Sequence, residues 1–323
     1  MAILDLQPAA RYEPVADLGI VTSYFNPSGF ASKRANYERF VAPMRAAGFS
    51  CRTIECAFGE APFELGAHAD VIRVRSRSVM FQKERLLNLA IGRLPPTCTK
   101  VAWIDGDVLF TDPLWAVRAS ERLDTCQVIQ PFDTAYRLPP RVYHYDGSGI
   151  ACRSFAATFV DDPEAFARGN FHQHGDTGFA WAARRQLVAK HGLYDAMILG
   201  SADHVMGHAV LGDWTSGCIR TTAGVNNPCA ADLRAWGRRF YADAKGSLGF
   251  AAGSLLHLWH GKAVNRRYVE RTKKLVGFGF DPKTDLRIGE SGAWEWASPK
   301  PELHTWVEAY FRDRQEDDEE GEA

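Results

Sequence analysis

The chain has 323 residues, of which 46% are hydrophobic and 24% charged, with a formal net charge of −1. This composition is that of an ordinary soluble globular protein, and no stretch approaches the ~20 apolar residues of a membrane-spanning helix. The first residues lack a basic segment followed by an apolar core, so we expect no secretory signal and a cytoplasmic location. The seven cysteines form no C-x-x-C pair. They predict reduced thiols, and neither a disulfide framework nor a zinc site.

The charge is unevenly distributed along the chain. The last eleven residues, DRQEDDEEGEA, have a balance of −6, so the body before them carries +5. We therefore expect residues 315–323 to form an acidic, disordered tail. A mildly basic body suits a polyanionic partner or a phosphorylated substrate.

Strands and helices alternate in the first half of the chain, after an N-terminal arm over 1–17. Strands are expected at 18–24, 50–58, 71–76, 100–110 and 126–132. Helices are expected at 32–48 with Ser32 as N-cap, at 80–94, and at 112–123 with Asp112 as N-cap. This order predicts an α/β fold with a doubly wound, mostly parallel (mixed) sheet and helices on both faces.

The second half begins with a polar, Pro/Gly-rich loop. A short strand then enters a helix that stops at Gly192, and a further strand is expected in GSLLHLWHG. Further helices are expected at about 201–211, 230–245, 265–279 and 301–314. Because we find no repeat and no long linker, we expect residues 18–314 to form a single domain with halves at 18–132 and 133–314.

Two aspartates, Asp105 and Asp107, interrupt the apolar segment VAWIDGDVLF. Carboxylates are costly to bury without partners. One interpretation is a turn, because Asp-Gly favours turns. The other is a divalent cation shared with substrate phosphates. The helix expected next, in place of a hairpin partner, favours the cation, because ligands bind at the carboxyl ends of strands in such sheets.

Two further segments carry candidate groups. HLWHG contains His257 and His260, either of which could be an ordinary core histidine; together with the aspartates they are candidate imidazole ligands, which favours Mn²⁺ over Mg²⁺. GSADHVMGHA contains Asp203, which is either a helix-terminal acid or a general base. No P-loop, G-x-G-x-x-G or G-x-S-x-G motif occurs, so ATP hydrolysis, dinucleotide redox chemistry and serine-hydrolase chemistry lose support.

The order of these segments resembles that of the GT-A-fold glycosyltransferases, most closely the family-2-like members of bacterial and phage type. The resemblance covers residues 18–314 and rests on VTSYFNP, QKERLLN, WIDGDVLF, GFAWAARRQLVAKHGLYD, GSADH, and HLWHG with NRRYVER. It implies a nucleotide-sugar donor, most often a UDP-sugar, and a bound Mn²⁺ or Mg²⁺. The half at 18–132 would bind the nucleotide-sugar and the half at 133–314 the acceptor.

The same resemblance assigns roles to individual residues. Asp105 and Asp107 would bridge the metal, the ribose and the pyrophosphate; His257 would be a further metal ligand, with His260 as the second choice. Asp203 would be the catalytic base of an inverting reaction. The donor would be bound by Ser23, Tyr24, Phe25, Asn26, Lys83, Asp105 and Trp181.

The acceptor is left open between two classes that the family includes. One is a hydroxymethylated pyrimidine in DNA, which a basic body and an aromatic-rich second half would suit. The other is a cell-envelope or other glycan, although the chain shows no anchor for a lipid-linked acceptor. Alternatives outside this activity are a sugar nucleotidyltransferase and a non-catalytic sugar- or nucleotide-binding protein. The oligomeric state is left open too.

Overall fold

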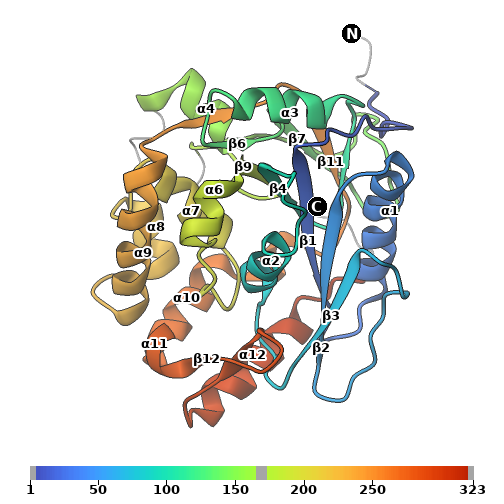
Figure 1. Cartoon of the computed structure of the whole chain (residues 1–323). Coiled ribbons are helices and arrows are strands. Elements are labelled where there is room, and N and C mark those ends of the chain that lie inside the picture. Colours follow the sequence, from blue (N-terminus) through green and yellow to red (C-terminus); the bar gives the residue numbers. More distant parts are fainter. Residues whose placement is uncertain (1–4, 165–172, 319–323) are drawn as a thin grey trace.

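The computed structural model describes residues 5–164 and 173–318, and a seven-stranded sheet forms its centre (Figure 1). β9 runs antiparallel to both of its neighbours, and the other pairs are parallel. The mixed, mostly parallel sheet predicted from the sequence is thus confirmed. In spatial order the strands are β10 (Leu248–Phe250), β6 (Val128–Gln130), β9 (Ala180–Arg184), β4 (Lys100–Ile104), β1 (Leu18–Phe25), β2 (Cys51–Phe58) and β3 (Val71–Ser76).

Helices cover both faces of this sheet. α1 (Ala31–Ala47) and α3 (Trp115–Leu123) pack on one face. The other face is covered by α2 (Lys83–Ile91), α6 (Arg185–His191), α7 (Ala202–Val210) and α9 (Pro228–Ala244). Along β4, Val101 and Trp103 pack on the face covered by α2, α6, α7 and α9, whereas Ala102 and Ile104 pack on the face covered by α1 and α3. A strand buried on both faces is continuously apolar, which is why this segment has no polar alternation.

Two smaller sheets and six further helical segments complete the described chain. The four-stranded sheet has the order β5 (Val108–Phe110), β11 (Ser254–His257), β7 (Thr134–Arg137) and β8 (Ile150–Arg153), and the two-stranded sheet pairs β12 (Leu286–Ile288) with β13 (Trp294–Trp296). The helical segments are α4 (Phe155–Asp161), α8 (Gly217–Ala223), η1 (Ala263–Arg266), α10 (Tyr268–Gly277), α11 (Pro282–Asp285) and α12 (Pro301–Asp313). None of the described helices has the length and apolar character that a bilayer crossing requires.

The single strand expected at 100–110 is two strands. β4 ends before Asp105, and β5 begins after Asp107 in the four-stranded sheet, where it pairs antiparallel with β11. The Asp-Gly-Asp segment therefore carries the chain from one sheet to another. The helix expected from Asp112 begins only at Trp115, and the Asp112 carboxylate accepts a hydrogen bond from the Leu114 amide in the preceding turn.

The expected Ser32 cap of α1 is also wrong. The helix begins at Ala31, and its N-cap residue makes no side-chain hydrogen bond. Instead, the carboxylate of Asp317 accepts hydrogen bonds from the amides of Ala31 (2.9 Å) and Ser32 (2.8 Å). A carboxylate from the far end of the chain thus satisfies the first amides of this helix.

The acidic tail expected at 315–323 is corrected for its first four residues. Glu316 is only 2% exposed, and its carboxylate lies 2.6 Å from Arg314 and 3.4 Å from Lys33. The indole of Trp259 donates to the carbonyl of Asp318. Residues 315–318 therefore dock on the body of the protein, and residues 319–323 lie outside the described residues.

Candidate active site

Three candidate residues from distant parts of the chain meet at the carboxyl end of β4. Asp105 directly follows β4, Lys83 is the first residue of α2, and Asp203 lies in the first turn of α7. The ammonium of Lys83 lies 2.6 Å from Oδ1 of Asp105 and 2.7 Å from Oδ2 of Asp203. The position agrees with the rule that ligands bind at this edge of an open α/β sheet.

The environment of Asp203 decides between its two interpretations. The N-cap of α7 is Ser201, and Asp203 uses Oδ2 to accept a hydrogen bond from Lys83. Burial raises the pKa of Asp203 to about 6, an effect that the charge of Lys83 reduces. Its Oδ1 is buried and has no hydrogen-bond partner among the described residues. Asp203 is therefore no helix cap, and it carries one uncommitted oxygen and a pKa suited to proton transfer.

Lys83 holds two carboxylates of like charge together. Burial lowers the pKa of Lys83, but Asp105 and Asp203 outweigh this effect and raise it well above its usual value. The ammonium therefore stays charged. It compensates the cost of placing two acids at one buried edge, since a buried charge needs a partner.

A second group lies beside the first, across Gly106. Asp107, His257 at the end of β11 and His260 in the loop that follows offer ligand atoms that all lie within 4.8 Å of one another. Nε2 of His257 and of His260 are 3.8 Å and 3.5 Å from Oδ2 of Asp107. The sequence ranked His257 above His260, and the structure brings both to Asp107.

The chemistry of this group fits a divalent metal. Burial and the nearby Asp105 raise the pKa of Asp107 to about 7, and its buried Oδ1 has no hydrogen-bond partner in the described part of the chain. Burial, with a contribution from Arg266, lowers the pKa of His257 and of His260 well below the usual value, so both rings are neutral. One carboxylate and two neutral imidazoles are an ordinary donor set for a divalent transition metal.

Arg266 distinguishes the two histidines. Its guanidinium contacts Nδ1 of the His260 ring and donates to the His260 carbonyl at 3.0 Å. A ring that accepts a hydrogen bond at Nδ1 carries its proton on Nε2, so a metal at Nε2 requires this contact to be released. His257 has the more available nitrogen in this arrangement.

The sequence analysis missed the charges that surround the metal group. Arg266 lies 3.7 Å from Glu316, which also pairs with Arg314 and Lys33. The docked Glu316 thus neutralises a basic cluster within reach of His260. Both segments, NRRYVER and the acidic tail, are visible in the sequence, but their contact is not.

The expected nucleoside-binding residues lie at the end of β1, the neighbour of β4. Tyr24 and Phe25 are buried, and the Tyr24 hydroxyl donates to Glu64. The side-chain amide of Asn26 donates to the same carboxylate at 3.0 Å, and Ser23 is partly buried. These four residues share the edge of the sheet with Asp105, and their contact with a nucleoside stays a prediction.

Trp181 occupies a different environment from the sugar-pocket wall that was expected. It lies on β9, is 2% exposed, and its indole donates to the carbonyl of Thr177. Its ring packs against Phe155 in the core. A role at the sugar would therefore need this part of the core to open.

A cavity of about 700 Å³ lies away from these residues. Asn88, Arg185, Asp195 and Trp294 are among its lining residues. Arg185 follows β9 next to the start of β4, and Arg85 and Asn88 of α2 also line the cavity, which therefore lies among the helices that cover one face of the sheet.

No protein-family model and no curated protein matches the chain. The catalytic domain of Drosophila β1,4-galactosyltransferase 7 with xylobiose is similar at a TM-score of 0.41 and 11% identity, over 91% of this chain and 99% of that one. The galactosyltransferase LgtC with donor and acceptor sugar analogues has a TM-score of 0.29 and 11% identity, over 81% and 95%. The 4-diphosphocytidyl-2C-methyl-D-erythritol synthase of Anaerococcus prevotii has a TM-score of 0.32 and 9% identity, over 76% and 90%. At these TM-scores the likeness assigns neither a family nor an activity to this chain.

Proposed function

We propose that the chain is a divalent-metal-dependent glycosyltransferase that moves a sugar from a nucleotide-sugar, most simply a UDP-sugar, to a hydroxyl acceptor. The observation that supports this most is the meeting of two groups at one edge of the sheet. Lys83 joins Asp105 to Asp203, and the Asp107–His257–His260 group lies directly beside them. The GT-A-like order of the motifs in the sequence agrees with it.

The metal group would hold Mn²⁺ or Mg²⁺ against the donor. Asp107, His257 and His260 supply protein ligands, and a bound cation would neutralise charge on the pyrophosphate of the leaving nucleoside diphosphate. Asp105, which Lys83 orients, would bind a ribose hydroxyl or a ligand water. The imidazole content favours Mn²⁺ over Mg²⁺.

Asp203 is the proposed base. Its free Oδ1 would accept the proton of the acceptor hydroxyl as that oxygen attacks the anomeric carbon, and a single displacement of this kind inverts the configuration. Asp176 is an alternative candidate for the base. One of its oxygens pairs with Arg137 and the other accepts a hydrogen bond from the Gly178 amide. Asp176 therefore has less capacity to take a proton than Asp203.

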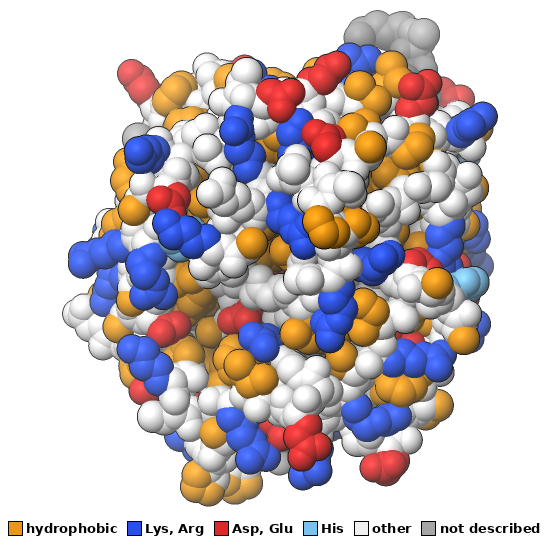
Figure 2. All heavy atoms as spheres, in the orientation of Figure 1, with side chains coloured by type: hydrophobic (Ala, Val, Ile, Leu, Met, Phe, Trp, Pro, Cys, Tyr) orange, Lys and Arg blue, Asp and Glu red, His pale blue; other side chains and the backbone are white. Residues whose placement is uncertain are grey.

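The acceptor hydroxyl would belong to one of two classes of molecule. Hydroxymethylated pyrimidine in DNA and a glycan hydroxyl are the two classes. With residues 315–318 docked, residues 1–318 carry a net charge of +2, so charge alone does not select the first class. On the face shown in Figure 2, lysine and arginine side chains are spread among acidic ones and form no single stripe. DNA binding on that face would therefore depend on scattered phosphate contacts.

The test is a panel of nucleotide-sugars incubated with the protein and Mn²⁺, scored for release of nucleoside diphosphate. Parallel reactions contain hydroxymethylated DNA, unmodified DNA or a glycan mixture, and the anomeric configuration of any product is read by NMR. Pyrophosphate release from a nucleoside triphosphate and a sugar 1-phosphate would instead indicate a nucleotidyltransferase. Donor binding without turnover across all acceptors would contradict the proposed transfer.

A further inference from the structure

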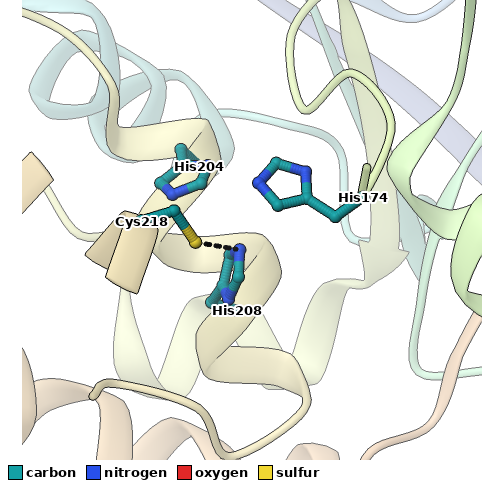
Figure 3. A group of neighbouring side chains, drawn as sticks. All are labelled: His174, His204, His208 and Cys218. Atoms are coloured by element: carbon teal, nitrogen blue, oxygen red, sulfur yellow. Dashed lines mark hydrogen bonds between the residues drawn. The ribbon is translucent and has the colours of Figure 1, made fainter. Parts of the chain in front are cut away.

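A second group of potential metal-binding side chains includes residues of α7, the helix whose first turn carries Asp203. His204 and His208 are one turn apart on α7 and so share a face of that helix. Cys218 lies in the first turn of α8, and His174 precedes β9. The four side chains point toward one another, and their ligand atoms all lie within 4.8 Å of one another (Figure 3). We call these four residues the histidine–cysteine cluster.

The cluster is enclosed. Its members are between 0% and 4% exposed. Phe155 forms an aromatic wall, with ring centroids 5.4 Å from His174 and 5.2 Å from His208. A nucleophilic cysteine has to be reached by its substrate, and Cys218 is not, so its placement beside a histidine does not describe a catalytic dyad.

Local structure brings the four residues together. Gly207, between the two histidines of α7, allows the helix to approach Phe155 and Trp181 closely, because a Cβ there would lie 3.2 Å from each ring. Gly175, next to His174, has a φ of +76°, and a Cβ there would meet the carbonyl of Ser154 at 2.6 Å. Gly175 therefore requires glycine, and a larger residue at position 207 would crowd the two rings.

The outer nitrogens of two histidines are held by the protein. Nδ1 of His208 contacts the Asp213 carboxylate at 2.7 Å, and Asp213 in turn accepts hydrogen bonds from the amides of Thr215 and Ser216. Nδ1 of His174 contacts the carbonyl of Gly175 at 2.8 Å. A carboxylate or carbonyl on the far nitrogen of an imidazole is the usual outer shell of a metal-binding histidine.

The inner atoms have matching spacing and chemistry. Nε2 of His208 lies 3.5 Å from Sγ of Cys218. In a tetrahedral zinc site, bonds of about 2.1 Å to nitrogen and 2.3 Å to sulfur place ligand atoms roughly 3.3–3.6 Å apart. Sγ of Cys218 and the ring nitrogens of the three histidines are the atom types that bind zinc. The thiolate is the form of cysteine that binds metal.

We propose that a structural zinc ion binds in this cluster, with four protein ligands: His174, His204, His208 and Cys218. Thiolate and imidazole together select zinc over Mg²⁺ or Mn²⁺, and four protein ligands leave no position for substrate. The ion cross-links α7, α8 and the segment before β9. It also fixes the helix whose first turn carries Asp203, next to His204. The zinc site does not depend on the proposed glycosyl transfer.

The test is the zinc content of the full-length protein purified without added metal, measured by inductively coupled plasma mass spectrometry. The double variant His257→Ala/His260→Ala removes the other metal group, so zinc remaining in it belongs to the cluster. We expect one zinc ion per chain in this background and its loss on adding Cys218→Ser. The matched control is Cys229→Ser, a buried cysteine whose Sγ contacts the Phe280 carbonyl. It should retain zinc.

Spectroscopy of the unaltered protein keeps the proposal testable if Cys218→Ser does not fold. Cobalt(II) in place of zinc should give a thiolate-to-cobalt charge-transfer band with tetrahedral d–d bands, and zinc-edge X-ray absorption should give one sulfur and three nitrogen ligands. Absence of both zinc and the cobalt–thiolate band would overturn the proposal. Zinc retained in folded Cys218→Ser, or rapid alkylation of Cys218 in the native protein, would overturn it too.

Discussion

Asp203 and Lys83 are in contact at 2.7 Å, although 120 residues separate them in the chain. The contact orients the Asp203 carboxylate by one oxygen and leaves the other, Oδ1, buried and without a hydrogen-bond partner in the described residues. A carboxylate held in this way has one oxygen directed by the protein and one left without a protein partner among the described residues. The predictions for this residue follow from that division.

Asp203→Asn should leave a folded, donor-binding and nearly inactive protein. The amide oxygen of the substituted side chain can still accept from Lys83, which keeps Asp105 as its second partner. The amide cannot take a proton, and loss of a general base typically costs ~10²–10⁴-fold in rate. Steady-state kinetics gives kcat, and calorimetric titration gives donor affinity.

The matched control is Asp195→Asn. Burial raises the pKa of the Asp195 carboxyl as it does that of Asp203, and the cationic partner of Asp195 is Arg85. Asp195 lines the cavity of about 700 Å³ and pairs with Arg85 and Asn88, which have no proposed part in the transfer, so its replacement should leave kcat within a few-fold of the parent. Turnover of Asp203→Asn that matches this control would place the base elsewhere.

The pH dependence of kcat/KM should carry an acid limb from Asp203. Its pKa is raised to about 6 from an ordinary value of 3.8, so the base is protonated and inactive below about pH 6. The stability contributed by Asp203 changes with pH in the opposite direction to the activity. The folded state holds this proton more tightly than the unfolded state, so this group's contribution to stability falls as pH rises from 3.8 through 6. The residual rate of Asp203→Asn, measured at saturating Mn²⁺, should lack the limb near pH 6.

The metal group predicts an unequal effect of its two histidines. EDTA should abolish activity and Mn²⁺ should restore it. His257→Ala should raise the Kd for Mn²⁺ by more than about 10-fold, and by more than His260→Ala does, because the His260 ring is engaged by Arg266. Mn²⁺ binding followed by electron paramagnetic resonance gives both constants. If both variants bound Mn²⁺ with the Kd of the parent, neither histidine would be a metal ligand.

The sheet was predictable because its pattern is local. Strands such as β4 are apolar at every position since both faces are covered, and the helices between them show their own spacing. The crossing at Asp105-Gly106-Asp107 was not predictable in the same way. Val108–Phe110 is as apolar in the four-stranded sheet as it would be in the central one. Only the pairing of β5 with β11 shows that this segment belongs to the four-stranded sheet.

Individual residues of the site could be predicted from the sequence, but the residues that they contact could not. Asp203 looked like a helix-terminal acid because its pairing with Lys83 depends on tertiary packing. The histidine–cysteine cluster contains no C-x-x-C pair, which is the spacing that usually indicates a zinc site in a sequence. Its ligands come instead from α7, α8 and the segment before β9, and no short spacing marks them. Acidic composition similarly suggested a solvated tail, although the carboxylates of Glu316, Asp317 and Asp318 have specific cationic or amide partners.

Removing residues 315–323 should destabilise the protein, contrary to what the composition of the tail suggests. Burial raises the pKa of Glu316, but Arg314, Lys33 and Arg266 outweigh it and lower the pKa to about 2. Glu316 therefore contributes stability that is fully present above pH 4.5 and is lost as pH falls through about 2. Leaving buried charges without their partner costs about 3–5 kcal/mol, and loss of the Asp317 cap on α1 about 1 kcal/mol. Chemical denaturation at pH 7 measures the sum.

The matched truncation removes only residues 319–323. It takes away three acidic residues and keeps Glu316 and Asp317, so the comparison of the two truncations separates the docking of residues 315–318 from overall charge. Glu316→Gln isolates the buried carboxylate, and we expect it to raise the Kd for Mn²⁺ as well, because Arg266 beside His260 loses its counter-charge. Identical unfolding free energies for both truncations would show that residues 315–318 contribute nothing. A stability loss in Glu316→Gln with unchanged Mn²⁺ affinity would confine Glu316 to a structural role.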